Sequence, residues 1–82
     1  MSAEITRYRD ALRDALANID SSESDVAVAI REAYARGIAA LAVRIALIDT
    51  PMWLDAEREI ERHGLARRNV LRGMRMQHGR AA

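Results

Sequence analysis

Apolar residues recur at helical spacing along most of the chain, and the longest such run covers residues 25–48. Within it, apolar side chains follow one another at steps of three or four residues, which places them on one stripe of an α-helix. They are Ile30, Tyr34, Ile38, Leu41, Ile45 and Ile48. Alanines flank this stripe on both sides, so neighbouring helices could approach closely. The pattern predicts one long central helix, with the stripe serving as the core, as a dimer seam, or as both.

A second amphipathic pattern precedes the central helix. Its apolar positions share one helical face and charged residues occupy the other; the apolar positions are Ile5, Tyr8, Leu12, Leu16 and Ile19. Ser2 can accept the first hydrogen bond of this helix, and Ser22 followed by Asp25 matches a capping box for the central helix. The polar residues 18–24 between the two patterns are enough for a turn. These signals predict an N-terminal helical hairpin.

Two short helices are expected after the central one. Thr50 followed by Pro51 is typical of a helix start, because proline fits the first helical position. Gly64 fits the position just past a helix C-terminus, where a left-handed conformation is common. We therefore predict helices over 51–62 and 66–77. The expected fold is an all-α domain of four helices over residues 1–79, with a frayed tail over 80–82.

The core of such a domain is thin. The chain has 82 residues, with no Phe, one Trp and sixteen Ala, so its buried side chains offer little apolar area. It also has no Cys, which excludes disulfide bonds. Association with another copy is a common way to stabilise a domain of this size. We expect a homodimer.

Charge is unevenly distributed along the chain. Residues 62–82 hold six Arg and no acid, a charge of +6 with His neutral, whereas residues 1–61 hold seven Arg and twelve acids, a charge of −5. The basic end predicts a surface for a protein or nucleic-acid partner. Its candidate residues are Arg62, Arg67, Arg68, Asn69, Arg72 and Arg75.

Residues 56–76 also carry the spacing of a helix-turn-helix motif. The residues that match are Ile60, Gly64, Leu65 and Val70. In such a motif the arginines of the second helix contact bases or phosphates. Gly73 departs from the pattern, because a branched apolar residue usually closes the second helix, and Ile60 is larger than the residue usual at its position. An ordinary helical corner at a glycine gives the same spacing, so DNA binding stays an alternative.

Residues suited to catalysis are scarce. The chain has no Cys and no Lys, and its four serines lie where helix caps explain them. Glu59 and His63 lie one turn apart, with His78 as a distant third group, which falls short of a metal site. We expect no catalytic, cofactor or metal site, no small-molecule substrate and no enzymatic activity.

Neither a secretory signal nor a membrane span is expected. The first ten residues carry charges from Glu4 onward and lack the apolar segment of a signal peptide. Charged residues also interrupt the run over 25–48, whereas a membrane span needs about 20 apolar residues. The expected location is the cytoplasm.

These expectations favour a non-catalytic protein–protein interaction module. The most specific form is a small homodimeric accessory protein that binds another protein and modulates or inhibits it. In size, helicity and lack of catalytic chemistry, the chain resembles the small accessory proteins that temperate bacteriophages and mobile elements use to inhibit host machinery. The alternative is a helix-turn-helix-like transcriptional regulator that binds DNA through residues 56–76.

Overall fold

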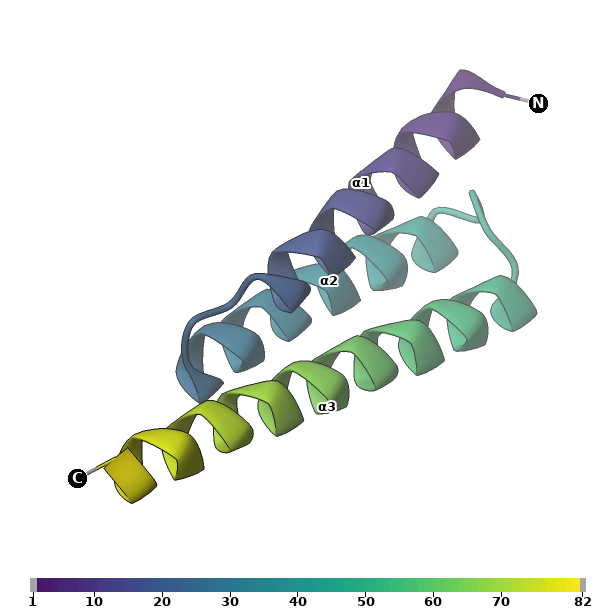
Figure 1. The fold of residues 1–82 in the computed structure, drawn as a ribbon. Helices are drawn as coiled ribbons and strands as arrows, with labels where there is room; N and C mark the ends of the chain where they lie inside the picture. The colour runs from purple at the N-terminus through teal and green to yellow at the C-terminus, as the bar shows by residue number, and fades with distance from the viewer. Residues whose placement is uncertain (1, 82) are drawn as a thin grey trace.

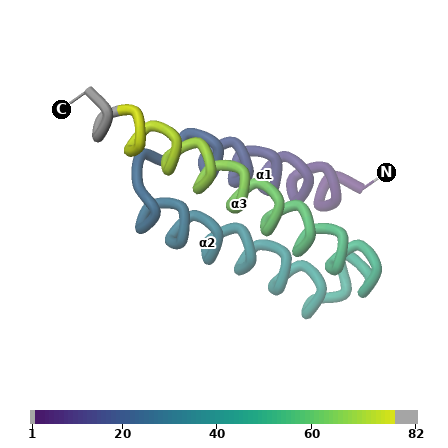
Figure 2. Tube along the Cα trace, turned by 60° about the horizontal axis from the view of Figure 1, so that its bottom comes forward, coloured from purple at the N-terminus to yellow at the C-terminus, as the bar shows by residue number. Residues whose placement is uncertain are grey.

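The computed structural model describes the backbone of residues 2–81 and the side chains of residues 2–77. This part of the chain is all-α and contains three helices: α1 (Ala3–Asp20), α2 (Asp25–Arg44) and α3 (Thr50–Ala81). α1 and α2 form an antiparallel hairpin, and α3 lies along both of them (Figure 1). Figure 2 shows the three helices from a second direction, with α3 running alongside both α1 and α2. The predicted fold class is confirmed, but the prediction of four helices is wrong.

The start of α1 follows its sequence signals closely. The hydroxyl of Ser2 accepts a hydrogen bond from the Ile5 backbone N–H at 3.2 Å, as expected of a helix cap. On the predicted apolar face, Tyr8 and Ile19 are buried and Leu12 is half-buried. This face of α1 packs against the other two helices.

The cap of α2 is Ser24, so the capping box predicted at Ser22 is wrong. The Ser24 hydroxyl accepts from the Ala27 N–H at 3.1 Å. Ser22 is instead fully buried in the preceding loop, where its hydroxyl donates to the Asn18 carbonyl at 3.0 Å and accepts from Arg31 at 3.1 Å. Burial of the Ser22 side chain therefore holds the loop against both helices of the hairpin.

α2 ends at Arg44, four residues before the predicted end. Ala46 has a left-handed backbone with φ of 60°, and the Leu47 N–H donates to the Ala42 carbonyl at 2.9 Å, which closes the end of the helix. The reversal turns Ile48 back into the protein, where it is buried. The next helix begins at Thr50, one residue before the predicted start at Pro51, and the Asp49 carboxylate caps it by accepting from the Met52 N–H at 2.9 Å.

α3 runs without interruption through Gly64, so the predicted break there is wrong. Gly64 is buried inside the helix and faces α2, and a Cβ atom at this position would collide with the carboxylate of Glu32. Glycine therefore makes room here for the Glu32 carboxylate and does not mark a turn. The helical propensity cost of about 1 kcal/mol for one glycine does not end a helix of this length.

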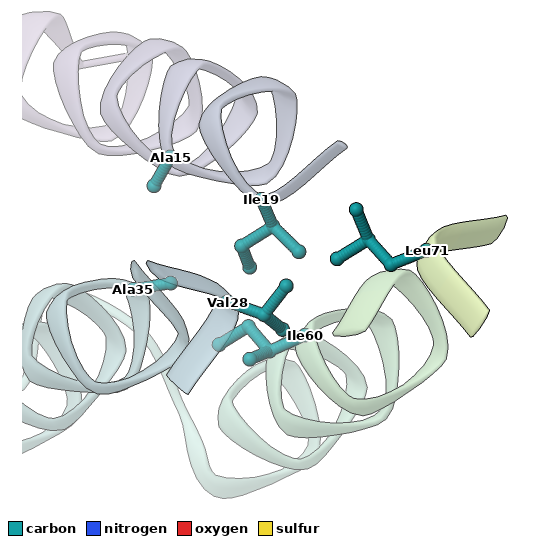
Figure 3. Close-up of a cluster of buried hydrophobic side chains, with 6 residues drawn as sticks. All are labelled: Ala15, Ile19, Val28, Ala35, Ile60 and Leu71. Atoms are coloured by element: carbon teal, nitrogen blue, oxygen red, sulfur yellow. The ribbon is translucent and has the colours of Figure 1, made fainter. Parts of the chain in front are cut away.

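Two clusters of buried apolar side chains hold the three helices together. Figure 3 shows the first, in which Ile19, Val28 and Ile60 point toward one another from three different helices. The second lies near the other end of the bundle, around Tyr8, Ala42 and Ile48. Each cluster combines large side chains with small ones, so close packing depends on both.

The buried face of α2 is not the predicted stripe. It consists of Val28, Glu32, Ala35, Ala39 and Ala42. From the stripe, Ile30, Tyr34, Leu41 and Ile45 are exposed, Ile38 is half-buried, and Ile48 is buried from the loop. The bundle closes on the small side chains because α1 and α3 supply bulky ones, such as Ile19 and Ile60, that fill the space between close helices. The interpretation of the whole stripe as the core of one chain is therefore wrong.

Candidate functional site

The outer face of α2 carries a continuous line of exposed apolar residues, here called the α2 strip. It consists of Val26, Ile30, Tyr34, Gly37 and Leu41 of α2 and of Ile45, the residue that caps its C-terminal end. The five side chains are 60–70% exposed. Single exposed apolar residues are ordinary, but a contiguous set along one helix is typical of an interaction site.

Spacing explains why these residues share a face. They follow one another at steps of four, four, three, four and four residues, which keeps them within about 100° of the helix circumference. The buried positions, from Val28 to Ala42, lie on the opposite side. α2 is therefore apolar on both sides, with one side covered by α1 and α3 and the other open to solvent.

A groove adjoins the C-terminal half of the strip. It has a volume of about 320 Å³ and lies between the N-terminal half of α1 and the C-terminal end of α2. Its apolar lining includes Tyr8 and Ile38, together with Leu41 and Ile45 of the strip. Apolar surface thus extends from the strip into a depression that another side chain can enter.

The basic C-terminal surface is largely occupied by contacts within the protein. Arg68 binds the Glu32 carboxylate through both terminal nitrogens, at 3.0 and 2.5 Å, and Arg67 donates to the Ser22 carbonyl at 2.7 Å. Arg62 pairs with Glu59 at 2.5 Å, and Arg75 lies 3.5 Å from Asp25. Of the six candidates, Asn69 and Arg72 are exposed and enter none of these pairs.

The pair between Glu32 and Arg68 is the strongest polar feature of the bundle. Glu32 is 6% exposed, and its carboxylate is held by the two charge-assisted hydrogen bonds from Arg68. These hydrogen bonds raise the pKa of Arg68 above its ordinary value. The arginine proposed as a DNA contact therefore joins α3 to α2.

The helix-turn-helix interpretation is not supported by this geometry. Residues 56–76 lie on one continuous helix, so the segment contains no second helix set at an angle to the first. Ile60 and Leu71 are buried against the other helices, while Val70 is 46% exposed. Of the four residues that matched the motif, Ile60 and Gly64 are buried, whereas Leu65 and Val70 are exposed, so the four do not pack together as they would in the motif.

His63 links α3 to α1, whereas Glu59 contacts residues of its own helix. The His63 Nδ1 atom lies 2.7 Å from the Asp20 carboxylate, and its Nε2 atom lies 3.6 Å from Glu59. A hydrogen bond from Arg62 lowers the pKa of Glu59, although burial opposes this effect. Within the described side chains no three His, Asp or Glu groups gather as metal ligands, and the side chain of His78 lies outside them.

Comparison with known proteins adds no further site. No protein-family model, no curated protein and no solved structure matches this chain. Over the described residues, each helix is too short or too polar to cross a lipid bilayer.

Sequence reasoning placed four of the strip residues on one stripe but missed Val26, Gly37 and the buried role of Glu32. The missed signal was a second periodic pattern on α2, with small or branched residues at steps of four, three, four and three from Val28 to Ala42. A single acid within such a pattern indicates a buried charge that needs a partner. Arg36, one turn after Glu32 on the same helix, is not that partner, because it contacts Glu57 at 3.3 Å.

Proposed function

We propose that this protein is a non-catalytic protein–protein interaction module, a small accessory protein that binds another polypeptide and modulates it. The observation that carries the proposal is the α2 strip, whose five large side chains are 60–70% exposed on a helix that also forms the core. Covering one such side chain contributes about 1–2 kcal/mol, given about 1.5–3 kcal/mol for complete burial. Five of them supply a substantial part of the free energy that association requires.

The arrangement of charges supports binding over catalysis. Glu32 with Arg68, Asp20 with His63, and Arg36 with Glu57 form pairs between helices. Such pairs position the helices that present the strip. A rigid helix with a preformed apolar face is well suited to docking against another helix, because few side chains must be ordered on binding.

The proposal is tested by capture from a lysate of the source cell. Purified protein is used as bait, with and without nuclease and at two salt concentrations, and bound proteins and nucleic acids are identified. We expect a stoichiometric protein that remains after nuclease treatment and at the higher salt concentration, because apolar contacts depend little on salt. Recovery mainly of nucleic acid that is lost at high salt would contradict the proposal.

Two matched variants locate the binding surface in the same assay. Leu41→Arg places a charge in the α2 strip, and Leu65→Arg places the same charge on α3, where Leu65 is 58% exposed compared with 60% for Leu41. Arg and Leu have similar helix propensities, so neither change should unfold the protein. Leu41→Arg should abolish capture and Leu65→Arg should preserve it. Equal capture by both variants would exclude the α2 strip as the surface.

A further inference from the structure

We infer that a second copy of this chain covers the α2 strip, with the two α2 helices antiparallel across a twofold axis. The inference rests on the proposed function, because it names one partner of the same surface. Three independent features of α2 support it: the order of its spacings, the positions of its largest and smallest strip residues, and the charges at its two ends.

The spacing of the strip is the same in both directions. Its steps of four, four, three, four and four residues mean that a reversed copy places every strip residue opposite another strip residue. Val26 faces Ile45, Ile30 faces Leu41, and Tyr34 faces Gly37 of the second copy. A twofold interface requires such self-complementarity, because each patch must fit its own reversed image. The axis passes between the positions of residues 35 and 36.

Tyr34 and Gly37 fit one another in this register. Tyr34 is the largest residue of the strip and is 66% exposed, whereas Gly37 is the smallest. Nothing within the chain lies within 4 Å of the place where a Cβ atom of Gly37 would be. The ring of one copy can therefore lie over the glycine of the other. A parallel pairing would set Tyr34 against Tyr34 and Gly37 against Gly37. The two rings would then be crowded at position 34, and a gap would remain at position 37.

The charges at the two ends of α2 favour the same direction. Glu23 lies exposed just before the N-terminal end of α2, and Arg44 lies exposed at the C-terminal end, whereas Asp25 is paired with Arg75 of its own chain. Antiparallel pairing brings Glu23 of each copy toward the Arg44 of the other, and it also sets the two helix dipoles in opposition. Parallel pairing would bring like charges together.

The groove completes the fit. It lies beside Leu41 and Ile45, which are the positions that meet Ile30 and Val26 of the second copy. Those two branched side chains can enter the 320 Å³ depression, and the twofold axis repeats this contact at the other end of the interface. The second copy thus covers both the strip and the groove beside it.

The first test measures mass in solution by sedimentation equilibrium over a range of concentrations. We expect a reversible dimer with twice the chain mass of 9.2 kDa. Gly37→Leu should weaken dimerisation at least tenfold, because the new side chain occupies the space taken by Tyr34. Gly73→Leu is the matched control: neither glycine has a neighbour within 4 Å of its Cβ position, and Gly73 lies on α3. Leucine has a higher helix propensity than glycine, so both variants should fold.

The second test determines the direction of pairing. The chain has no cysteine, so single cysteines can be introduced as Val26→Cys and Ile45→Cys without background. On oxidation, a mixture of the two variants should give disulfides between unlike chains, with few disulfides in either variant alone. Efficient linkage within each variant alone would indicate parallel pairing and overturn the inference.

The outcomes separate this inference from the proposed function. The inference is overturned if the chain stays monomeric at all concentrations, or if Gly37→Leu dimerises as tightly as the wild type. Either result can occur together with capture of another protein that Leu41→Arg abolishes, in which case the proposed function stands without the dimer. A dimer with the expected cross-links supports the inference even if the lysate yields no other protein. In that case the proposed role in modulating another protein is contradicted, while the inference of a dimer stands.

Discussion

Glu32 of α2 and Arg68 of α3 form a bidentate ion pair, and the carboxylate of Glu32 occupies the space that a side chain at Gly64 would fill. The three residues define one close contact between the two helices. Of the pair, Glu32 is the buried partner, and its carboxylate is stable there only while Arg68 is paired with it. This contact also fixes how far α2 rotates, and hence which side of α2 faces outward.

Substitution at Gly64 should be destabilising, in contrast to the usual effect of replacing a helical glycine. Gly64→Ala should lower the free energy of unfolding by about 2 kcal/mol, because its Cβ collides with Glu32. Gly73→Ala should raise it by about 1 kcal/mol, because its Cβ meets open space and alanine favours the helix. Urea denaturation followed by circular dichroism measures both. A Gly64→Ala protein as stable as wild type would contradict the close contact.

The ion pair itself can be tested by removing its exposed partner. Arg68→Gln leaves the Glu32 carboxylate buried and should cost about 2–4 kcal/mol, somewhat less than a fully buried pair because Arg68 is partly exposed. Arg75→Gln removes an exposed pair with Asp25 and should change stability by less than about 1 kcal/mol. The comparison is made by urea denaturation at neutral pH. Equal effects of the two substitutions would show that Glu32 is not buried as described.

The end of α2 stores local strain that a substitution can remove. Ala46 has a left-handed backbone, which costs about 1–2 kcal/mol for a residue with a side chain. Ala46→Gly should therefore raise the thermal midpoint, with a gain of about 1 kcal/mol. Ala40→Gly, at an exposed position inside α2, should lower stability by a similar amount. If Ala46→Gly were as harmful as Ala40→Gly, the turn after α2 would not have the described conformation.

Stability should fall at alkaline pH because Tyr8 is buried. Burial raises the pKa of the Tyr8 phenol above its ordinary value of 10.0, since the charged form is poorly solvated. The folded state therefore holds its proton more tightly than the unfolded state. The resulting stability is complete below pH 10 and is lost as pH rises through the folded-state pKa. Denaturation at pH 8 and pH 11 should show a decline in the wild type that is smaller in Tyr8→Phe, with Tyr34→Phe, on an exposed ring, as the control.

Some features of this protein were determined locally and could be predicted from the sequence. Ser2 caps α1, the face from Ile5 to Ile19 packs inward, and Thr50 and Pro51 begin α3. Each depends on residues within a few positions of one another, through a cap, a proline or a repeated apolar spacing. Local signals of this kind act before any helix meets another, so they do not require knowledge of the partners.

Other features depended on residues far apart in sequence. From the sequence, Gly64 resembles a helix end, but in the structure it lies against Glu32 in the middle of α3. The stripe from Ile30 to Ile45 resembles a core, but the alanines of α2 are the residues that face α1 and α3. A helix that is apolar on both sides gives no local indication of which side its neighbours will cover. The sequence by itself determined that its apolar faces would form helices and assemble. Only the tertiary structure decided that α2 packs through its small side, because close approach there buries the larger side chains of α1 and α3 and leaves Ile30, Tyr34 and Leu41 exposed for a partner.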